Sequence, residues 1–250
     1  MGIKEVSKDK LGRTVMLIVP AMIVSLVLLS VYGAFLGPYR AKSFFNSPAL
    51  SAYWLALMAL LVTAFVVFPR QVRLPGLFLI HGGCSLILAG ALWGSGTGLK
   101  VQNHLFGTDK FQTGQMAIFE GDAENRIRLE GSDQIKELPF HIKLKDFRIE
   151  YYKPESVRDC ISDVQVVKDG KVVAEKSIEV NHPLHFGGYH FCQSSFDAQG
   201  HGYTVLSVVS DTGLDIVYAG YLALGIGVFW HFWLRHLFTK REIEEQINGT

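Results

Sequence analysis

A histidine stands inside one of the most apolar stretches of this chain. The stretch reads "LPGLFLIHGGCSLILAGALWG" and surrounds His81 with Leu, Ile, Phe and Gly. An ionisable side chain is costly inside a lipid bilayer, which makes His81 a functional candidate. Imidazole Nε2 is a common axial ligand of haem iron, and Gly82 and Gly83 leave room for a flat macrocycle or another helix. The residues indicate either haem ligation at His81 or a hydrogen bond between packed helices.

A second histidine lies in the last apolar stretch, within "GVFWHFWLRH". If this stretch is a helix that runs back toward the cytoplasm, His231 lies a few residues from its end, at nearly the depth of His81. Two histidines at one depth on different helices would hold a haem within a single chain. His236, beyond Arg235, is expected to be an interfacial residue beside Trp230 and Trp233.

The remaining histidines lie in a polar segment before that stretch: His104, His141, His182, His185, His190 and His201. Their spacing matches no zinc-binding pattern. We expect solvated histidines in a turn, with a transient haem or metal contact as the alternative. Cys160 and Cys192 lie in the same segment, where a disulfide between them and two free thiols are both open.

Four apolar runs explain where these residues lie. They cover Val15 to Leu36, Leu50 to Phe68, Leu74 to Trp93 and Leu214 to Leu234. Each is close to the about 20 residues that cross a bilayer as a helix. The sequence therefore predicts four transmembrane helices and a division into residues 1–95, 96–213 and 214–250.

Basic residues predict the orientation of these helices. Nine lie in three segments that the positive-inside rule places in the cytoplasm: Lys4, Lys8, Lys10, Arg13, Arg70, Arg73, Arg235, Lys240 and Arg241. Two, Arg40 and Lys42, lie in the first loop on the other side. We expect a multi-pass cell-membrane protein with both termini in the cytoplasm. The formal net charge of +1, with no basic stripe, gives no reason to expect nucleic acid binding.

The outer segment, Ser95 to Gly213, shows the periodicity of strands. "PFHIKLKDFRIEYY" alternates at period two with a shift at Asp146, which predicts two strand stretches joined by a bulge. Asp169–Gly170 is flanked by valine-rich runs and predicts a hairpin turn. No part of the segment has the length and period of a helix. We therefore expect an extracytoplasmic β-rich domain, a sandwich or an open barrel, between the third and fourth helices.

Two segments carry a resemblance to a known family. "LPFHIKLKDFRIEYY" and "VNHPLHFGGYHFCQSSFD" are similar to motifs of ResB (CcsB) proteins, membrane components of system II cytochrome c biogenesis. The second motif is carried by Asn181, Pro183, Leu184, Gly188, Tyr189, Gln193, Ser194, Ser195 and Asp197. The chain is shorter than typical members, and Cys192 replaces their usual aromatic residue. From the residues alone, the second motif is a strand, a tight turn and a strand, and we interpret it as a structural corner.

The resemblance implies a function. It implies that His81 ligates haem b together with a histidine of a ResC (CcsA) partner subunit, and that the complex binds or transports haem and presents it to apocytochrome c outside the membrane. The expected partners are thus a ResC (CcsA)-like subunit, apocytochrome c and the lipid bilayer. No catalytic acid, base or nucleophile is recognised in this chain, so its contribution to a cytochrome c synthase complex would be positioning.

Two other functions stay open at the level of sequence. One is a b-type haem subunit of a respiratory complex, in which His81 and His231 carry an electron-transferring haem. The other is a structural subunit without haem, whose β domain binds a partner.

Overall fold

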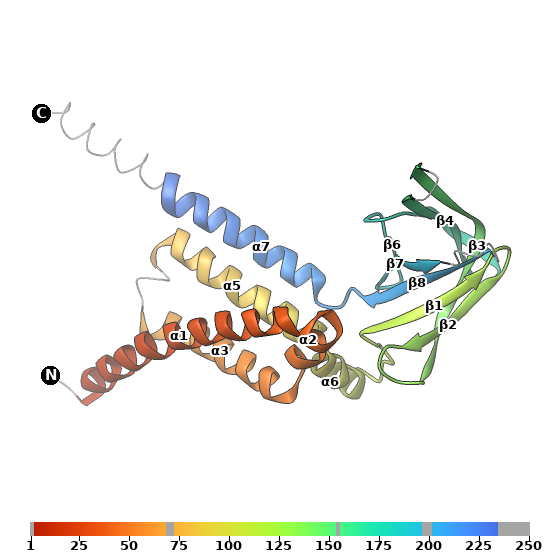
Figure 1. Cartoon of the computed structure of the whole chain (residues 1–250). Helices are drawn as coiled ribbons and strands as arrows, with labels where there is room; N and C mark the ends of the chain where they lie inside the picture. Colours follow the sequence, from red (N-terminus) through yellow and green to blue (C-terminus); the bar gives the residue numbers. More distant parts are fainter. Residues whose placement is uncertain (1–2, 69–72, 154–155, 197–201, 235–250) are drawn as a thin grey trace, which may run out of the picture. The chain divides into compact units, whose positions relative to one another are not determined.

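A computed structural model describes residues 3–68, 73–153, 156–196 and 202–234 (Figure 1). The chain forms two compact units, one of Met1–Lys100 with Gly213–Thr250 and one of Val101–Thr212. Residues of the sequence analysis that lie outside the described ranges are Arg70, Asp197, His201, Arg235, His236, Lys240 and Arg241.

The first unit is helical. Its helices are α1 (Ile3–Leu36), α2 (Pro38–Phe45), α3 (Pro48–Val67), α5 (Pro75–Gly94), the start of α6 (Gly96–Phe106), α7 (Leu214–Phe229) and the π-helical turn η1 (Trp230–Leu234). Proline opens α2, α3 and α5, where its missing N–H would have no helical partner. Within the described residues, four segments are long and apolar enough to cross a membrane: Lys10–Leu36, Pro48–Val67, Pro75–Gly94 and Leu214–Leu234. The prediction of four membrane helices is confirmed.

The structure corrects the expectation that the outer segment begins without a helix. Helix α6 occupies its first residues. Ser95 caps this helix, because its Oγ accepts a hydrogen bond from Gly98 N at 3.1 Å. Leu99, which is 3% exposed, and Gln102 are buried on one side of it. A serine directly after the third apolar run is the feature of the sequence that indicates the start of this helix.

Helices α5 and α7 lie side by side (Figure 1), and a seam of glycines lines the contact between them. The seam, which we call the glycine seam, repeats every seven residues on both helices: Gly76, Gly83 and Gly90 on α5, and Gly213, Gly220 and Gly227 at and along α7. A Cβ added to Gly83 would lie 2.7 Å from Leu224 N, and one added to Gly90 would lie 2.7 Å from Gly213 O. The two backbones are therefore in direct contact and run antiparallel.

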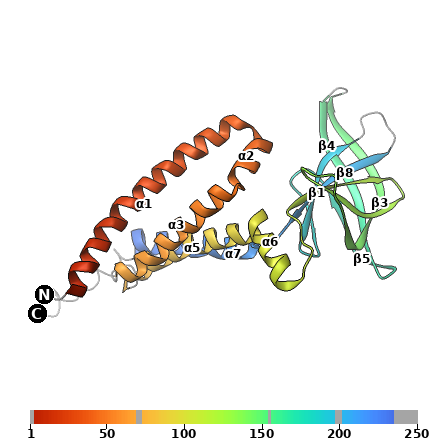
Figure 2. The same ribbon diagram turned by 90° about the horizontal axis from the view of Figure 1, so that it is seen from below.

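The second unit is built on one antiparallel sheet with eight strands. The strands are β1 (Thr113–Phe119), β2 (Ala123–Leu129), β3 (Ile135–Lys153), β4 (Ser156–Lys168), β5 (Lys171–Ile178), β6 (Leu184–Phe186), β7 (Tyr189–Phe196) and β8 (Tyr203–Ser210). Their order in the sheet is β5-β4-β3-β2-β1-β8-β7-β6. The sheet curls on itself (Figure 2), and its two ends meet where Lys176 Nζ donates to Pro183 O at 2.6 Å and where Glu179 bridges His182. The β-rich domain is thus a nearly closed barrel.

Alternating side chains fill the barrel. Phe191, Met116, Ile142 and Leu206 are fully buried within a core to which all eight strands contribute. The predicted bulge is confirmed, because the β3–β4 register shifts between Leu144 and Asp146. The predicted hairpin is confirmed as well: Asp169 and Gly170 both have positive φ, 52° and 73°, between β4 and β5, as a type I′ turn requires.

Candidate functional site

His81 lies on the face of α5 that points away from α7. Gly83 faces α7, and His81 precedes it by two residues, which places the two roughly 200° apart around the helix. The His81 ring instead lies beside Phe65 of α3, with ring centroids 6.3 Å apart and planes at 75°. The side chain is half-buried and lies about 9 Å from the start of the helix at 1.5 Å per residue.

The hydrogen bond of His81 fixes which ring nitrogen is available. Nδ1 lies 2.9 Å from Leu77 O, and a carbonyl only accepts, so Nδ1–H is the donor. In the neutral imidazole Nε2 then carries the lone pair. Within the described ranges Nε2 has no hydrogen-bond partner. A histidine held through Nδ1–H on a backbone carbonyl is the form in which imidazoles ligate metals.

The two glycines beside His81 differ in what they face. Gly83 belongs to the glycine seam and is closed by α7. A Cβ added to Gly82 would have no heavy atom of the described residues within 4 Å. The chain therefore has open space beside a histidine with a free Nε2, and these residues fit a haem at His81. Gly83 acts by holding α5 against α7, whereas Gly82 leaves space on the exposed side.

His231 lies elsewhere on the helical pair. It belongs to η1, and a Cβ added to Gly76 would lie 2.9 Å from His231 Cβ and 3.1 Å from its backbone nitrogen. His231 is thus level with Gly76, five residues before His81, an offset of about 7.5 Å along the axis. The prediction that His81 and His231 lie at nearly the same depth is therefore corrected: His231 lies closer to the end of the helical pair at which α5 begins. Because two axial ligands bind one iron atom, this offset and the orientation of His81 do not favour a shared haem.

The second family-like motif forms a corner of the barrel. Asn181, with φ of 65°, turns the chain between β5 and β6, and Gly187 and Gly188, with φ of 64° and 82°, turn it between β6 and β7. Gln193 then reaches across to β4, where its Oε1 accepts from Ser162 Oγ at 2.8 Å. The interpretation of this motif as strand, tight turn and strand agrees with the structure.

Gln193 belongs to a buried polar network. Its Nε2 donates to Thr204 Oγ1 at 2.8 Å, and Ser162 Oγ lies 3.2 Å from the same hydroxyl. Ser162 and Thr204 are both 0% exposed. Buried polar groups are stabilising only when paired, and this network pairs them across β4, β7 and β8.

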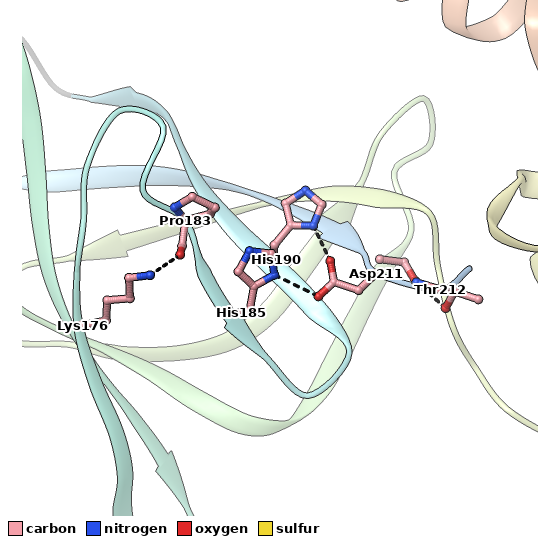
Figure 3. A network of polar contacts seen from close by, with 7 residues as sticks. Lys176, Pro183, His185, His190, Asp211 and Thr212 are labelled. Carbon is pink, nitrogen blue, oxygen red and sulfur yellow. Dashed lines mark hydrogen bonds and ion pairs between the residues drawn. The ribbon is translucent and has the colours of Figure 1, made fainter. Parts of the chain in front are cut away.

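Two of the outer histidines meet on this corner (Figure 3). His185 and His190 are direct cross-strand partners on β6 and β7, with ring centroids 5.5 Å apart. Both turn Nδ1 toward Asp211, at 3.2 Å from Oδ2 for His185 and 2.6 Å from Oδ1 for His190. His182 and His185 are exposed, as expected of solvated histidines, whereas His190 is partly buried, and the pairing of His185 and His190 with Asp211 was not expected. A two-residue turn at Gly187–Gly188 would have placed the two histidines opposite each other, but no local pattern points to Asp211.

The cysteines of the barrel are free thiols. Cys160 and Cys192 form no disulfide in this structure. Burial raises the pKa of both thiols, and Asp159 and Asp211 respectively raise it further. Both therefore stay protonated at neutral pH and pack as small apolar side chains.

More than half of the chain matches one known protein family. The model of the ResB-like family matches residues 71–204, which is more than half of the sequence. The chain belongs to the ResB-like family. This match begins just before α5 and ends within β8, so it includes His81, Gly82, His185, His190 and Gln193. His231 and Asp211 lie beyond it.

Two similar proteins are much longer than the segments that match this chain. The cytochrome c biogenesis protein CcsB of Microcystis aeruginosa is 27% identical over 174 residues, which are 69% of this ResB-like chain and 36% of that protein. Protein NrfI of Wolinella succinogenes is 36% identical over 96 residues, 38% of this chain and 10% of NrfI. The chain thus corresponds to about a third of the CcsB protein and a tenth of NrfI.

One solved structure resembles the chain only weakly. The cytochrome c haem lyase CcmF aligns with a TM-score of 0.40 and 12% identity, over 85% of this chain and 34% of CcmF. A likeness of this size shows neither a shared fold nor a shared function.

Proposed function

We propose that this ResB-like chain acts in cytochrome c biogenesis as a membrane subunit that binds haem at His81. The observation that carries the proposal is the bond from His81 Nδ1–H to Leu77 O, which leaves Nε2 free beside the open space at Gly82. The name of the CcsB relatives, cytochrome c biogenesis protein, supports a role in this process. When bound, haem supplies the macrocycle that becomes covalently attached to apocytochrome c.

The residues of the chain bind and orient in this proposal. Leu77 O holds the ring of His81 in one orientation and one tautomer. The glycine seam fixes α5 against α7, so the backbone that carries His81 is rigid. A ResC (CcsA)-like partner subunit would supply the other histidine that holds the haem, because His231 is offset from His81 within this chain.

The barrel has the role of a docking and shaping domain outside the membrane. Basic residues support this orientation. Lys10, Arg13 and Arg73 lie near the helix ends that the positive-inside rule places in the cytoplasm, and the barrel is inserted between the other ends of α5 and α7. In this orientation apocytochrome c binds on the side of the membrane that holds the barrel. The chain contributes proximity and orientation to attachment, which are substantial catalytic factors by themselves.

Haem content after co-expression tests the proposal. The chain is co-expressed with a ResC (CcsA)-like subunit and purified, and its reduced-minus-oxidised spectrum and the maturation of a c-type cytochrome are recorded. His81→Ala should lower both, and added imidazole should restore haem, because it enters the space left by the side chain. His231→Ala is the matched control and should change both only slightly.

Other outcomes point to the other functions. Stable haem in the chain purified alone, lost in either single variant, would identify a self-contained b-type electron carrier. Intact haem content and intact maturation in His81→Ala would leave a structural subunit without haem.

A further inference from the structure

His185, His190 and Asp211 form a compact group on the barrel that the proposed function does not use. Their ligand atoms, two imidazole nitrogens and a carboxylate oxygen, all lie within 4.8 Å of one another. Imidazole and carboxylate are the donors that zinc and neighbouring divalent transition metals prefer. We propose that these three residues bind a divalent transition-metal ion, with Zn²⁺ as the reference ion.

The distances suit one metal ion. Two ligand atoms on a tetrahedral zinc lie about 3.4 Å apart, given metal–ligand bonds of about 2.0–2.2 Å. His185 Nδ1 and Asp211 Oδ2 are 3.2 Å apart, and His190 Nδ1 and Asp211 Oδ1 are 2.6 Å apart. Small rotations of the side chains would therefore bring all three donors to bonding distance of one ion.

The backbone holds the three residues in place before any ion binds. His185 and His190 are paired across the β6–β7 hairpin, whose turn is Gly187–Gly188. Asp211 N donates to Gly188 O at 2.9 Å, so the carboxylate is tied to the turn of the same hairpin. Ligands on paired strands keep their geometry better than ligands on free loops.

The charge and the exposure of the group favour a bound cation. Among the described residues, no lysine or arginine forms an ion pair with Asp211. The nearby Lys176 Nζ is bonded to Pro183 O instead (Figure 3). The side chain of His185 is 55% exposed, whereas those of His190 and Asp211 are 24% and 22% exposed. An ion can thus enter from solvent, and three protein donors leave a fourth position for water or another ligand.

Zinc titration of the full chain tests the proposal. The protein is purified in detergent, stripped with a chelator and titrated with Zn²⁺ against a chromophoric competitor. We expect one equivalent to bind, and His185→Ala, His190→Ala and Asp211→Asn each to weaken binding by roughly tenfold or more. Co²⁺ in place of Zn²⁺ should give the visible absorption of a nitrogen- and oxygen-ligated ion in wild type and not in these variants.

Two controls separate this group from other zinc-binding groups. His182→Ala removes an exposed histidine of the same segment, and Cys192→Ser removes a thiol on the same strand as His190. Neither should change the affinity. The proposal is overturned if His182→Ala or Cys192→Ser weakens binding as much as Asp211→Asn, or if no equivalent binds. It is also overturned if the three variants lower thermal stability without changing zinc affinity, since the group would then be a hydrogen-bonded brace.

Discussion

At the scale of single residues, the orientation of a ring decides what a histidine can do. His81 and His231 look alike in the sequence, as histidines within apolar runs. In the structure His81 is held through Nδ1 on Leu77 O, whereas the backbone of His231 is packed on Gly76. The apolar context was enough to single out both residues. The two histidines differ in the direction of their side chains and in their position along the helices. Both depend on how α3, α5 and α7 pack, which the residues next to each histidine do not reveal.

Gln193 offers a prediction about the barrel. Gln193→Ala should destabilise the barrel by about 1–3 kcal/mol, because Ser162 and Thr204 would lose partners while buried. Urea-dependent proteolysis of the full chain in detergent measures the loss. Ser194→Ala, at the next and exposed position, should leave the midpoint unchanged. Equal midpoints for Gln193→Ala and wild type would show that the network contributes no stability.

Adjacent glycines in the β6–β7 turn give a second prediction. Gly187 and Gly188 both have positive φ, so alanine at either position should cost about 1 kcal/mol. A Cβ at Gly187 would also lie 2.6 Å from Phe140 Cε1 in the core, whereas one at Gly188 meets nothing within 4 Å. Gly187→Ala should therefore cost about 1–3 kcal/mol more than Gly188→Ala. The same proteolysis assay compares them, and equal losses would contradict the close contact with Phe140.

At the scale of elements, the glycine seam between α5 and α7 determines which faces of α5 remain open. Gly83 and Gly90 are closed by the backbone of α7, and Gly82 is not. In membranes small residues let helix backbones approach closely, so the seam accounts for the glycine content of both helices. It also explains why His81 faces α3.

Neighbouring glycines on α5 test the seam. Gly83→Ala should destabilise the helical unit by about 1–3 kcal/mol, because the new methyl group would overlap the α7 backbone. Gly82→Ala, one position away in open space, should keep or raise stability, since alanine favours helix over glycine. Thermal aggregation of the purified protein, followed by size-exclusion chromatography, measures both. A larger loss in Gly82→Ala than in Gly83→Ala would exclude the seam.

The elements show which parts of the fold the sequence reveals. The bulge near Asp146 and the turn at Asp169–Gly170 were predictable, because period-two patterns and turn residues are local. Closure of the sheet into a barrel was not, since it depends on contacts such as that of Lys176 with Pro183 O. The group of His185, His190 and Asp211 was not predictable either, because it also depends on contacts between distant parts of the chain. Its histidines are five residues apart, but Asp211 joins them from the end of β8.

At the scale of the whole molecule, four apolar helices and a barrel make a multi-pass membrane protein of the ResB-like family. The number of spans was predictable because it depends only on the length and composition of apolar runs. The orientation rests on the distribution of basic residues and remains a prediction.

Cysteine accessibility measures that orientation. In a variant without the native cysteines, Asp169→Cys in the β4–β5 turn should react with an impermeant maleimide added outside intact cells. Arg73→Cys, two residues before α5, should react only after permeabilisation, because basic segments stay in the cytoplasm. The reverse pattern would place the barrel inside and remove it from the side where cytochromes c are assembled.

The glycine seam also bears on the size of the domain that can be inserted between α5 and α7. The chain leaves α5 at Gly94 and returns at Gly213, and a Cβ at Gly213 would lie 3.1 Å from Gly94 N. The two junctions of the intervening segment are thus held side by side by the helices themselves. The entropic cost of closing such a segment grows slowly, by about 0.6 kcal/mol for each doubling of its length. The packing of α5 on α7 should therefore tolerate inserted domains of very different size at this point.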